Sequence, residues 1–315
     1  TNNNVTATVP VGTGPWGVAV SSDGSKVYVT NSNSSDVSVI DTTNNTVIDT
    51  VKVGTNPFGV AVNPNGTKVY VANLGNSNIS VIDTSNNTVT ATVNVGIYPA
   101  GIAVNPNGTS VYVVSSAYGN AAFNSTLFVI DTAENNITAT VPVGNGPIGV
   151  AVSPDGEKVY VTNSYSNATS VIDTSNNTVA TTVPVGYFPY GVAVTPDGTK
   201  VYVANFLSNT TSVIDTANNT VTATVAVGLY PSGVAVTPDG TKVYVVNVDG
   251  TVSVIDTTNN TVIAVVKAGD AHLVIGQFIG KGPTVPSAVK STGGALSDIR
   301  QFIGKDQQSN IISVN

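Results

Sequence analysis

Side chains on which many catalytic and cofactor sites depend are scarce in this 315-residue sequence. It has no cysteine, no methionine and one histidine, His272, so disulfide bridges, thiolate chemistry and zinc or haem sites built from Cys, Met or several His ligands are excluded. Charged residues make up only 9%, with a net charge of −7 and a single arginine, so no nucleic-acid partner is expected. No apolar run approaches the roughly 18–20 residues that cross a bilayer, so we predict no transmembrane segment. The sequence starts at Thr1 with no recognisable targeting segment, so we expect any leader to have been removed or excluded.

The sequence does contain an internal repeat. A Val-Gly or Ala-Gly step recurs with spacings of 42, 42, 48, 42, 42 and 41 residues, at Gly12, Gly54, Gly96, Gly144, Gly186, Gly228 and Gly269. Each unit holds four short runs rich in Val, Ile, Tyr and Thr, which suit β-strands, and turn signals such as Asp23-Gly24 separate the runs. Four antiparallel strands in about 42 residues is the size of a propeller blade. A helical repeat would need a 3.6-residue period, which is absent.

The two ends of the sequence complete one further unit. When residues 309–315 (SNIISVN) are placed before residues 1–12 (TNNNVTATVPVG), the joined segment aligns with residues 35–54 of the first complete unit, with a gap of one residue. We therefore predict an all-β, seven-bladed β-propeller of four-stranded antiparallel blades, a single domain over residues 1–315. The last blade is split between the N- and C-termini, formed by about 269–315 plus 1–12, with an irregular insertion at about 281–297. The N-terminus is expected to provide the outer strand and the segments LVIGQFI, DIRQFIG and IISVN the inner three, which removes open sheet edges.

The most regular segment of the repeat resembles a known family. KVYVTN at 26–31 recurs as KVYVAN, SVYVVS, KVYVTN, KVYVAN and KVYVVN, beside SPDG- and SVID-type segments. These motifs resemble the YVTN-family β-propellers, best known from archaeal surface-layer proteins, and GQFIG at 276–280 is similar to the end of their closing blade. The resemblance covers residues 1 to about 280. It implies a seven-bladed propeller, an extracellular cell-surface setting and a structural or adhesive role, but no particular activity, since propellers host many functions.

Aromatic residues gather in the connections between the fourth run of one unit and the first run of the next. They are irregularly placed, at Trp16, Phe58, Tyr98, Tyr187, Phe188, Tyr190 and Tyr230. One hypothesis is a binding face that stacks on sugar rings or packs on a partner. The other is that these side chains cover the gaps between neighbouring blades. Another set of tyrosines recurs at one position and is assigned to packing or hydrogen bonding within the blades: Tyr28, Tyr70, Tyr112, Tyr160, Tyr202 and Tyr244.

The candidate chemical groups do not combine into a catalytic site. His272 has no G-x-S-x-G serine to partner it, and the glutamates Glu134 and Glu157 are too few for an obvious glycosidase pair. GQFIGK at 276–281 lacks the spacing of a phosphate-binding loop. A repeated carboxylate is predicted to bond turn amides rather than to form a metal ring, at Asp41, Asp83, Asp131, Asp173, Asp215 and Asp256. We therefore predict no catalytic residue, no cofactor and no metal.

Asn-x-Ser/Thr sequons are frequent, which is typical of a glycosylated extracellular surface. Four of them fall in the more protruding loops and are the predicted N-glycosylation sites: Asn33, Asn124, Asn167 and Asn209. The alternative is that Asn-Asn-Thr is a favourable turn that was copied by duplication.

The function predicted from these features is that of a non-catalytic cell-surface protein, a subunit of a surface layer, sheath or filament. Its few charges oppose self-association only weakly. Two alternatives remain open: an adhesion module that binds a glycan or a surface protein through the aromatic face, and a lactonase- or hydrolase-like enzyme. The enzyme is disfavoured because the first strand of each unit offers mainly Gly-Val-Ala-Val. The split blade could close within one chain or exchange strands between neighbours.

Overall fold

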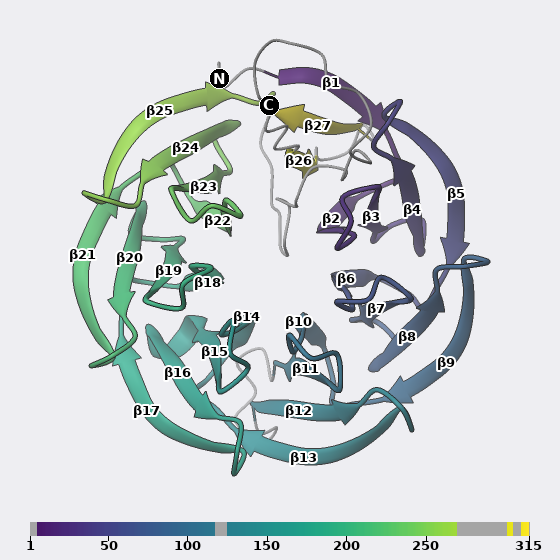
Figure 1. Cartoon of the computed structure of the whole chain (residues 1–315), viewed down its shortest axis with the longest axis horizontal. Coiled ribbons are helices and arrows are strands. Elements are labelled where there is room, and N and C mark those ends of the chain that lie inside the picture. The colour runs from purple at the N-terminus through teal and green to yellow at the C-terminus, as the bar shows by residue number, and fades with distance from the viewer. Residues whose placement is uncertain (1–4, 117–124, 270–300, 305–309, 315) are drawn as a thin grey trace, which may run out of the picture.

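The computed structural model describes residues 5–116, 125–269, 301–304 and 310–314, and in these ranges the chain is β-structure apart from one short 3-10 turn, η1 (Ser164–Ser166). Six antiparallel sheets of four strands surround a common axis, and a further sheet lies in the remaining part of the ring (Figure 1). Within each of the six sheets the strands follow chain order, with the first nearest the axis and the fourth on the rim. The predicted all-β propeller of four-stranded antiparallel blades is confirmed.

The six complete blades have closely matching strand bounds. Blade 1 consists of β2 (Pro15–Val20), β3 (Lys26–Asn31), β4 (Asp36–Asp41) and β5 (Thr46–Lys52). Blade 2 consists of β6 (Pro57–Val62), β7 (Lys68–Asn73), β8 (Asn78–Asp83) and β9 (Thr88–Asn94). Blade 3 consists of β10 (Pro99–Val104), β11 (Ser110–Ser115), β12 (Thr126–Asp131) and β13 (Asn136–Pro142). Blade 4 consists of β14 (Pro147–Val152), β15 (Lys158–Asn163), β16 (Ala168–Asp173) and β17 (Thr178–Pro184). Blade 5 consists of β18 (Pro189–Val194), β19 (Lys200–Asn205), β20 (Thr210–Asp215) and β21 (Thr220–Ala226). Blade 6 consists of β22 (Pro231–Val236), β23 (Lys242–Asn247), β24 (Thr251–Asp256) and β25 (Thr261–Lys267).

The two ends of the chain meet in the seventh sheet, as the sequence predicts. Its described strands are β26 (Gln301–Gly304), β27 (Asn310–Val314) and β1 (Val5–Pro10), in the order β1-β27-β26. Strand β1 lies on the rim between β25 and β5, antiparallel to β27 (Figure 1). The predicted innermost strand (LVIGQFI) and the insertion at 281–297 lie outside the described residues.

The blade repeats because each turn is stabilised locally. In blade 1, Gly24 has a φ of 72°, and the Asp23 carboxylate accepts a hydrogen bond of 3.0 Å from the Ser25 amide. Asx-Gly turns of this kind supply the left-handed backbone that a tight hairpin requires. The second and third strands that follow are almost wholly buried between neighbouring blades, while the fourth strand exposes most of its side chains. Val and Ile therefore dominate the second and third strands, and Thr alternates with Val on the fourth strand at the rim.

Neighbouring blades are joined by contacts that recur around the ring. In the first strands, at the axis, a glycine faces a backbone carbonyl of the next blade. A Cβ atom at Gly17 would collide with the Phe58 oxygen. Further out, Lys26 Nζ donates to the Thr84 oxygen of the next blade at 3.3 Å. Three further lysines repeat this bond to the following blade, namely Lys68, Lys158 and Lys200. Small residues near the axis and long ones further out thus fit wedge-shaped blades into a ring.

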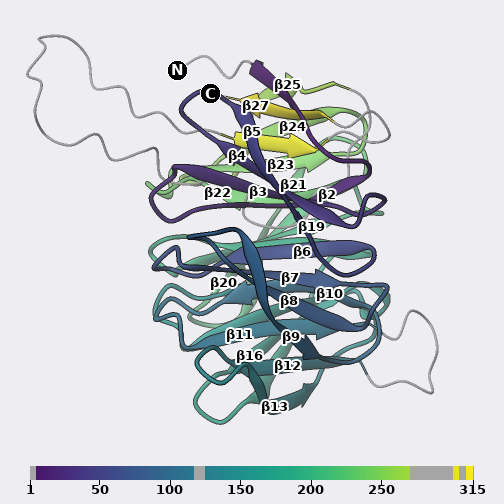
Figure 2. The same cartoon turned by 90° about the vertical axis from the view of Figure 1, so that its right-hand side faces the viewer.

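Strand connections gather at two opposite faces of the ring, which Figure 2 shows from the side. We call the face with the connections from first to second and from third to fourth strands the turn face. The face with the connections from second to third strands, and from the fourth strand to the next blade, is the loop face. The turn face consists of turns of nearly constant sequence, and the loop face consists of segments of variable sequence and length.

We expect Val9→Ala to lower the free energy of unfolding by roughly 2 kcal/mol, because Val9 is 1% exposed on β1 and its loss leaves a cavity where the ring closes. Val5→Ala, on the same strand but 38% exposed, is the matched control and should change stability by less than about 0.5 kcal/mol. Denaturant unfolding of both variants is the measurement. Equal effects of the two substitutions would contradict the buried pairing of β1 with β27.

We also expect alkaline pH to destabilise the blades. Burial raises the pKa of Tyr28, Tyr70, Tyr160 and Tyr202 to about 12, from an ordinary value near 10. The folded state therefore keeps protons that the unfolded state releases, so the stabilisation is complete below pH 10 and is lost as the pH rises toward 12. Ultraviolet titration should show part of the twelve tyrosines ionising only near pH 12 in native protein, but near pH 10 in denaturant. Titration of all twelve near pH 10 with the native circular dichroism retained would refute this assignment.

Candidate functional site

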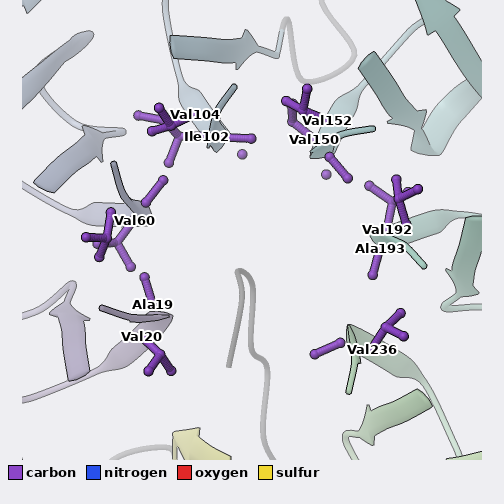
Figure 3. Close-up of a pocket in the computed structure, with 18 of the residues that line it drawn as sticks. Ala19, Val20, Val60, Ile102, Val104, Val150, Val152, Val192, Ala193 and Val236 are labelled. Carbon is purple, nitrogen blue, oxygen red and sulfur yellow. The ribbon is translucent and has the colours of Figure 1, made fainter. Parts of the chain in front are cut away.

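An axial channel runs between the first strands of the six complete blades and is the main cavity described below. Its volume is about 530 Å³, and Figure 3 shows part of its lining, with the labelled residues of the first strands arranged around it. The described lining consists of Val, Ala, Ile, Gly and Pro, with Ser21, Ser22 and Asn63 toward the turn face. No lining residue in the described ranges has a titratable side chain, so this part of the wall offers no acid-base pair to a substrate.

The repeated carboxylates at the ends of the third strands serve the turns. Asp83 Oδ1 accepts hydrogen bonds from the Ser85 hydroxyl and amide, at 2.6 and 2.8 Å, and Asp173 is bonded in the same way by Ser175. These bonds favour the ionised form and hold the pKa of both carboxyls below its usual range. Within the described ranges, His, Asp and Glu side chains form no group of three that could hold a metal ion.

The seven predicted aromatic residues fall into two groups. Phe58 and Tyr190 are buried, at 5% and 8% exposed, and the half-buried Trp16 ring lies 4.8 Å from that of Phe58 on the next blade. For these three the gap-covering hypothesis describes the packing. Tyr98 and Tyr230 are 44% and 45% exposed and Tyr187 is 67% exposed, whereas Phe188 is half-buried. The exposed group remains available for binding.

Blades 4, 5 and 6 bring part of the second group together with residues that sequence reasoning missed. The Tyr165 and Phe188 rings lie 5.5 Å apart, Phe188 and Phe206 6.0 Å, and Phe206 and Tyr230 5.2 Å, so the rings form a continuous row. Leu207, 56% exposed, donates its amide to the Tyr187 oxygen at 3.1 Å and so lies beside the row. We call this surface the aromatic ridge, formed by Tyr165, Tyr187, Phe188, Phe206, Leu207 and Tyr230.

Tyr165 and Phe206 were missed because they belong to the connections between second and third strands. Each follows the second strand of its blade, which is the KVYVTN-type segment. Tyr165 lies at the position that Asn33 holds in blade 1, and Phe206 lies at the position that Leu74 holds in blade 2. The signal in the sequence is the aromatic residue in a segment that is otherwise Asn, Ser and Gly. What the sequence does not reveal is that these two loops lie next to the loops that carry Phe188 and Tyr230.

The backbone beneath the ridge adopts an unfavourable conformation. Phe188 and Tyr230 have φ values of 54° and 53°, and Tyr98 of blade 3 has 52°. At the same repeat position blades 1 and 4 have glycine, Gly14 and Gly146, which suits a left-handed conformation. A bulky residue there costs roughly 1–2 kcal/mol relative to an unstrained one.

Side-chain amides hold these strained residues in place. Asn167 Oδ1 accepts a hydrogen bond of 3.0 Å from the Phe188 amide, and Asn209 Oδ1 one of 2.9 Å from the Tyr230 amide. Each asparagine lies in the loop of the preceding blade, so the bond also joins two blades. The aromatic side chains are consequently presented by a fixed backbone.

The charges of the described residues are divided unevenly between the two faces. The turn face carries twelve carboxylates and five lysines, whereas the loop face carries two of each. On the loop face Lys52 and Asp36 form a salt bridge of 2.9 Å, and the other two charges are Lys267 and Asp249. Over the described residues the loop face is thus neutral and the turn face strongly acidic.

The predicted glycosylation sites that are described all lie on the loop face. Asn33 is exposed, in the connection between β3 and β4, while Asn167 and Asn209 are half-buried with their Oδ1 atoms engaged as above. Asn124, His272 and the segment 276–281 lie outside the described residues. Among the described residues no helix is long and apolar enough to cross a membrane.

Comparisons with known proteins place the fold but not the activity. A family model described as lactonase, 7-bladed beta-propeller, matches residues 1–143. No curated protein matches the chain. Among 1776 similar chains of solved structure is one titled Kuenenia stuttgartiensis hydrazine synthase, with a TM-score of 0.81 and 21% sequence identity, covering 96% of this chain and 95% of that one. At this identity the likeness concerns the fold alone, and so common a fold is compatible with many functions.

The two groups of aromatic residues should respond differently to substitution. Tyr190→Ala is expected to lower the free energy of unfolding by about 3–5 kcal/mol, because it empties a buried site. Tyr230→Asn should lower it by less than about 1 kcal/mol, because relief of the left-handed strain offsets the lost contact with Phe206, and asparagine holds the equivalent position, Asn56, in blade 2. Thermal and denaturant unfolding of the two variants measures the difference. A loss at Tyr230 as large as that at Tyr190 would mean that both rings are primarily packing residues.

Proposed function

We propose that this chain is a non-catalytic structural protein of the cell surface, a subunit of a surface layer, sheath or filament that self-associates through its loop face. The observation that supports this most directly is the separation of charge between the two faces. A chain with a net charge of −7 repels its own copies, and the repulsion is greatest between the acidic turn faces. Two loop faces can approach each other without bringing net charge together.

The rim is a less suitable surface for assembly. Each of the six complete blades ends in an outer strand with one open edge, and open edges favour pairing with another chain. In all six the register between third and fourth strands shifts by a bulge, as between Val39 and Ile40 in blade 1. A bulge twists an edge strand and hinders the addition of a further strand. This leaves the loop face as the better candidate.

The cell-surface setting is supported by the resemblance of the repeated KVYVTN-type segments to YVTN-family propellers. It is also consistent with the low charge and the abundance of glycosylation sequons, and association through the loop face requires Asn167 and Asn209, which lie in its loops, to be free of glycan. A non-catalytic role is supported by the apolar walls of the described part of the channel, where a propeller enzyme would need polar groups.

A second candidate is a lactone-hydrolysing enzyme, because a family model of seven-bladed lactonases matches residues 1–143. We expect the purified chain to hydrolyse neither aliphatic lactones nor aryl esters above the rate of a buffer control, with and without added divalent cations. Chromogenic and pH-indicator assays are the measurement. Turnover that saturates with substrate, and that is lost when the channel residue Val150 is replaced by Trp, would replace the structural proposal with an enzymatic one.

Self-association should strengthen with salt. Raising the ionic strength from about 0.01 M to about 1 M shortens the Debye length from about 30 Å to about 3 Å, which removes repulsion between acidic subunits and leaves apolar contacts intact. Light scattering and analytical ultracentrifugation over a concentration series, with electron microscopy of the products, measure this. A chain that stays monomeric at every salt and protein concentration would contradict the proposal. Association that weakens with salt would show that charge complementarity, not the neutral face, joins the subunits.

A further inference from the structure

We propose that the aromatic ridge on blades 4, 5 and 6 is the docking surface for a second copy of this chain. The two copies meet about a two-fold axis through the ridge, with their acidic turn faces pointing away from each other. This inference rests on the self-association proposed above and names the surface of one of its contacts, which joins subunits in pairs, since a two-fold contact closes on itself.

The ridge has the composition of an interface core. Tyr165, Tyr187, Leu207 and Tyr230 are 50%, 67%, 56% and 45% exposed, and the half-buried rings of Phe188 and Phe206 join Tyr165 and Tyr230 into one row. The loop segments that form it, 143–147, 163–168, 185–189, 205–210 and 227–231, contain no charged residue, and one carboxylate borders them, since Asp249 accepts a hydrogen bond of 2.8 Å from the Leu229 amide. Tyrosine enrichment and charge depletion distinguish the centre of a protein interface from ordinary surface.

Four backbone amides of the ridge segments are already paired within the subunit, so covering these amides has little desolvation cost. The Tyr187 amide donates to Ser208 Oγ at 2.7 Å, and the Asn145 amide to Ser166 Oγ at 2.8 Å. The Phe188 and Tyr230 amides donate to asparagine oxygens, as described above. A surface whose amides are paired internally can be buried without leaving donors unsatisfied.

The exposed side chains of the ridge supply about half of the area of a standard dimer interface. An aromatic side chain buries roughly 150–250 Å² when it is fully covered, so the half-exposed tyrosines and Leu207 offer on the order of 400 Å². A standard interface buries about 800 Å² on each partner. The rest of the contact area would come from residues beside the ridge. These are Leu229, which is 51% exposed and precedes Tyr230, and the Asn and Ser residues of the same loops.

Two residues of the ridge occupy a strained backbone position that glycine holds in other blades. Glycine at position 146 shows that the loop closes without an aromatic residue, yet Phe188 and Tyr230 occupy the left-handed position in the next two blades. Strain of this kind is found where a side chain has a functional role. Tyr98 of blade 3 lies outside the ridge and adopts the same conformation, so the strain belongs to this repeat position and does not by itself mark an interface.

A second copy fits this ridge better than a charged partner does. A two-fold axis places the same patch on both sides of the interface, so an apolar, uncharged patch is complementary to itself. The alternative of stacking the ridge on an acidic turn face would bury aromatic side chains against carboxylates. Back-to-back pairing instead separates the two acidic faces by the full thickness of both rings.

The test uses the full-length chain with two ridge variants and a matched control. Tyr187→Asp places a charge at the most exposed ring, and Tyr230→Asn removes a ring without adding charge. Tyr98→Asn makes the same change at an equally exposed, equally left-handed residue on blade 3, outside the ridge. Sedimentation equilibrium should show at least a tenfold weaker dimer for both ridge variants and no change for Tyr98→Asn, with all three melting near the wild-type temperature.

Cysteine cross-linking tests the two-fold arrangement, because the natural chain has no cysteine to interfere. Single variants Tyr165→Cys, Tyr187→Cys and Leu207→Cys are oxidised and analysed on non-reducing gels, with Thr43→Cys on the turn face as the control. At least one ridge cysteine, close to the axis, should give a covalent dimer, and Thr43→Cys should not. Cross-linking at Thr43→Cys, or at no ridge position while the ridge variants still lose association, would overturn the two-fold arrangement.

The outcomes separate this inference from the proposed function. If wild-type protein associates and Tyr187→Asp and Tyr230→Asn associate as strongly as it does, the ridge is not the interface, but self-association itself still stands. Wild-type protein that is monomeric throughout would overturn both. Monomeric wild-type protein that binds a neutral glycan on an array, with binding lost in both ridge variants and kept in Tyr98→Asn, would assign the ridge to carbohydrate instead.

Discussion

The close approach of neighbouring inner strands is the constraint on which the rest of this structure depends. A glycine in each of five blades faces a backbone carbonyl of the next blade so closely that a Cβ atom would collide with it, at Gly17, Gly59, Gly101, Gly149 and Gly191. This fixes the blades at a narrow separation near the axis, and the larger Tyr, Val and Ile side chains fill the wider space further out. A ring built of such wedges must close, which is why the chain ends are drawn into one sheet, β1-β27-β26.

The two faces of the ring are under different demands. On the turn face the backbone requires Asx-Gly and Asp-Thr turns, whose carboxylates accept amide hydrogen bonds, so acidic residues accumulate there as a consequence of turn geometry. On the loop face the connections only have to span the distance to the next strand or blade. They can vary in sequence, and it is there that aromatic residues occupy unfavourable left-handed positions such as Phe188 and Tyr230.

The same division explains the absence of chemistry along the described part of the axis. The inner strands must be small and apolar to pack, so the channel that they surround is lined by Val, Ala, Gly and Pro (Figure 3). The variable polar and aromatic side chains lie instead on the loop face. Any ligand or partner is therefore more readily recognised on a surface than in the described part of the channel, and exposed side chains such as Tyr187 and Leu207 are the natural points of contact.

The sequence by itself determined the repeat, the strand order and the joining of the two ends, because each of these follows from local turn chemistry and from a pattern repeated six times. It also located the aromatic loops. Only the tertiary structure decided which of those side chains are exposed: Phe58 and Tyr190 are buried against neighbouring blades, while Tyr187 and Tyr230 are not. It alone brought Tyr165 and Phe206 beside them, because these contacts join residues that are 18 to 24 positions apart and lie on different blades or loops. Exposure and adjacency depend on how blades pack, and no local pattern encodes that.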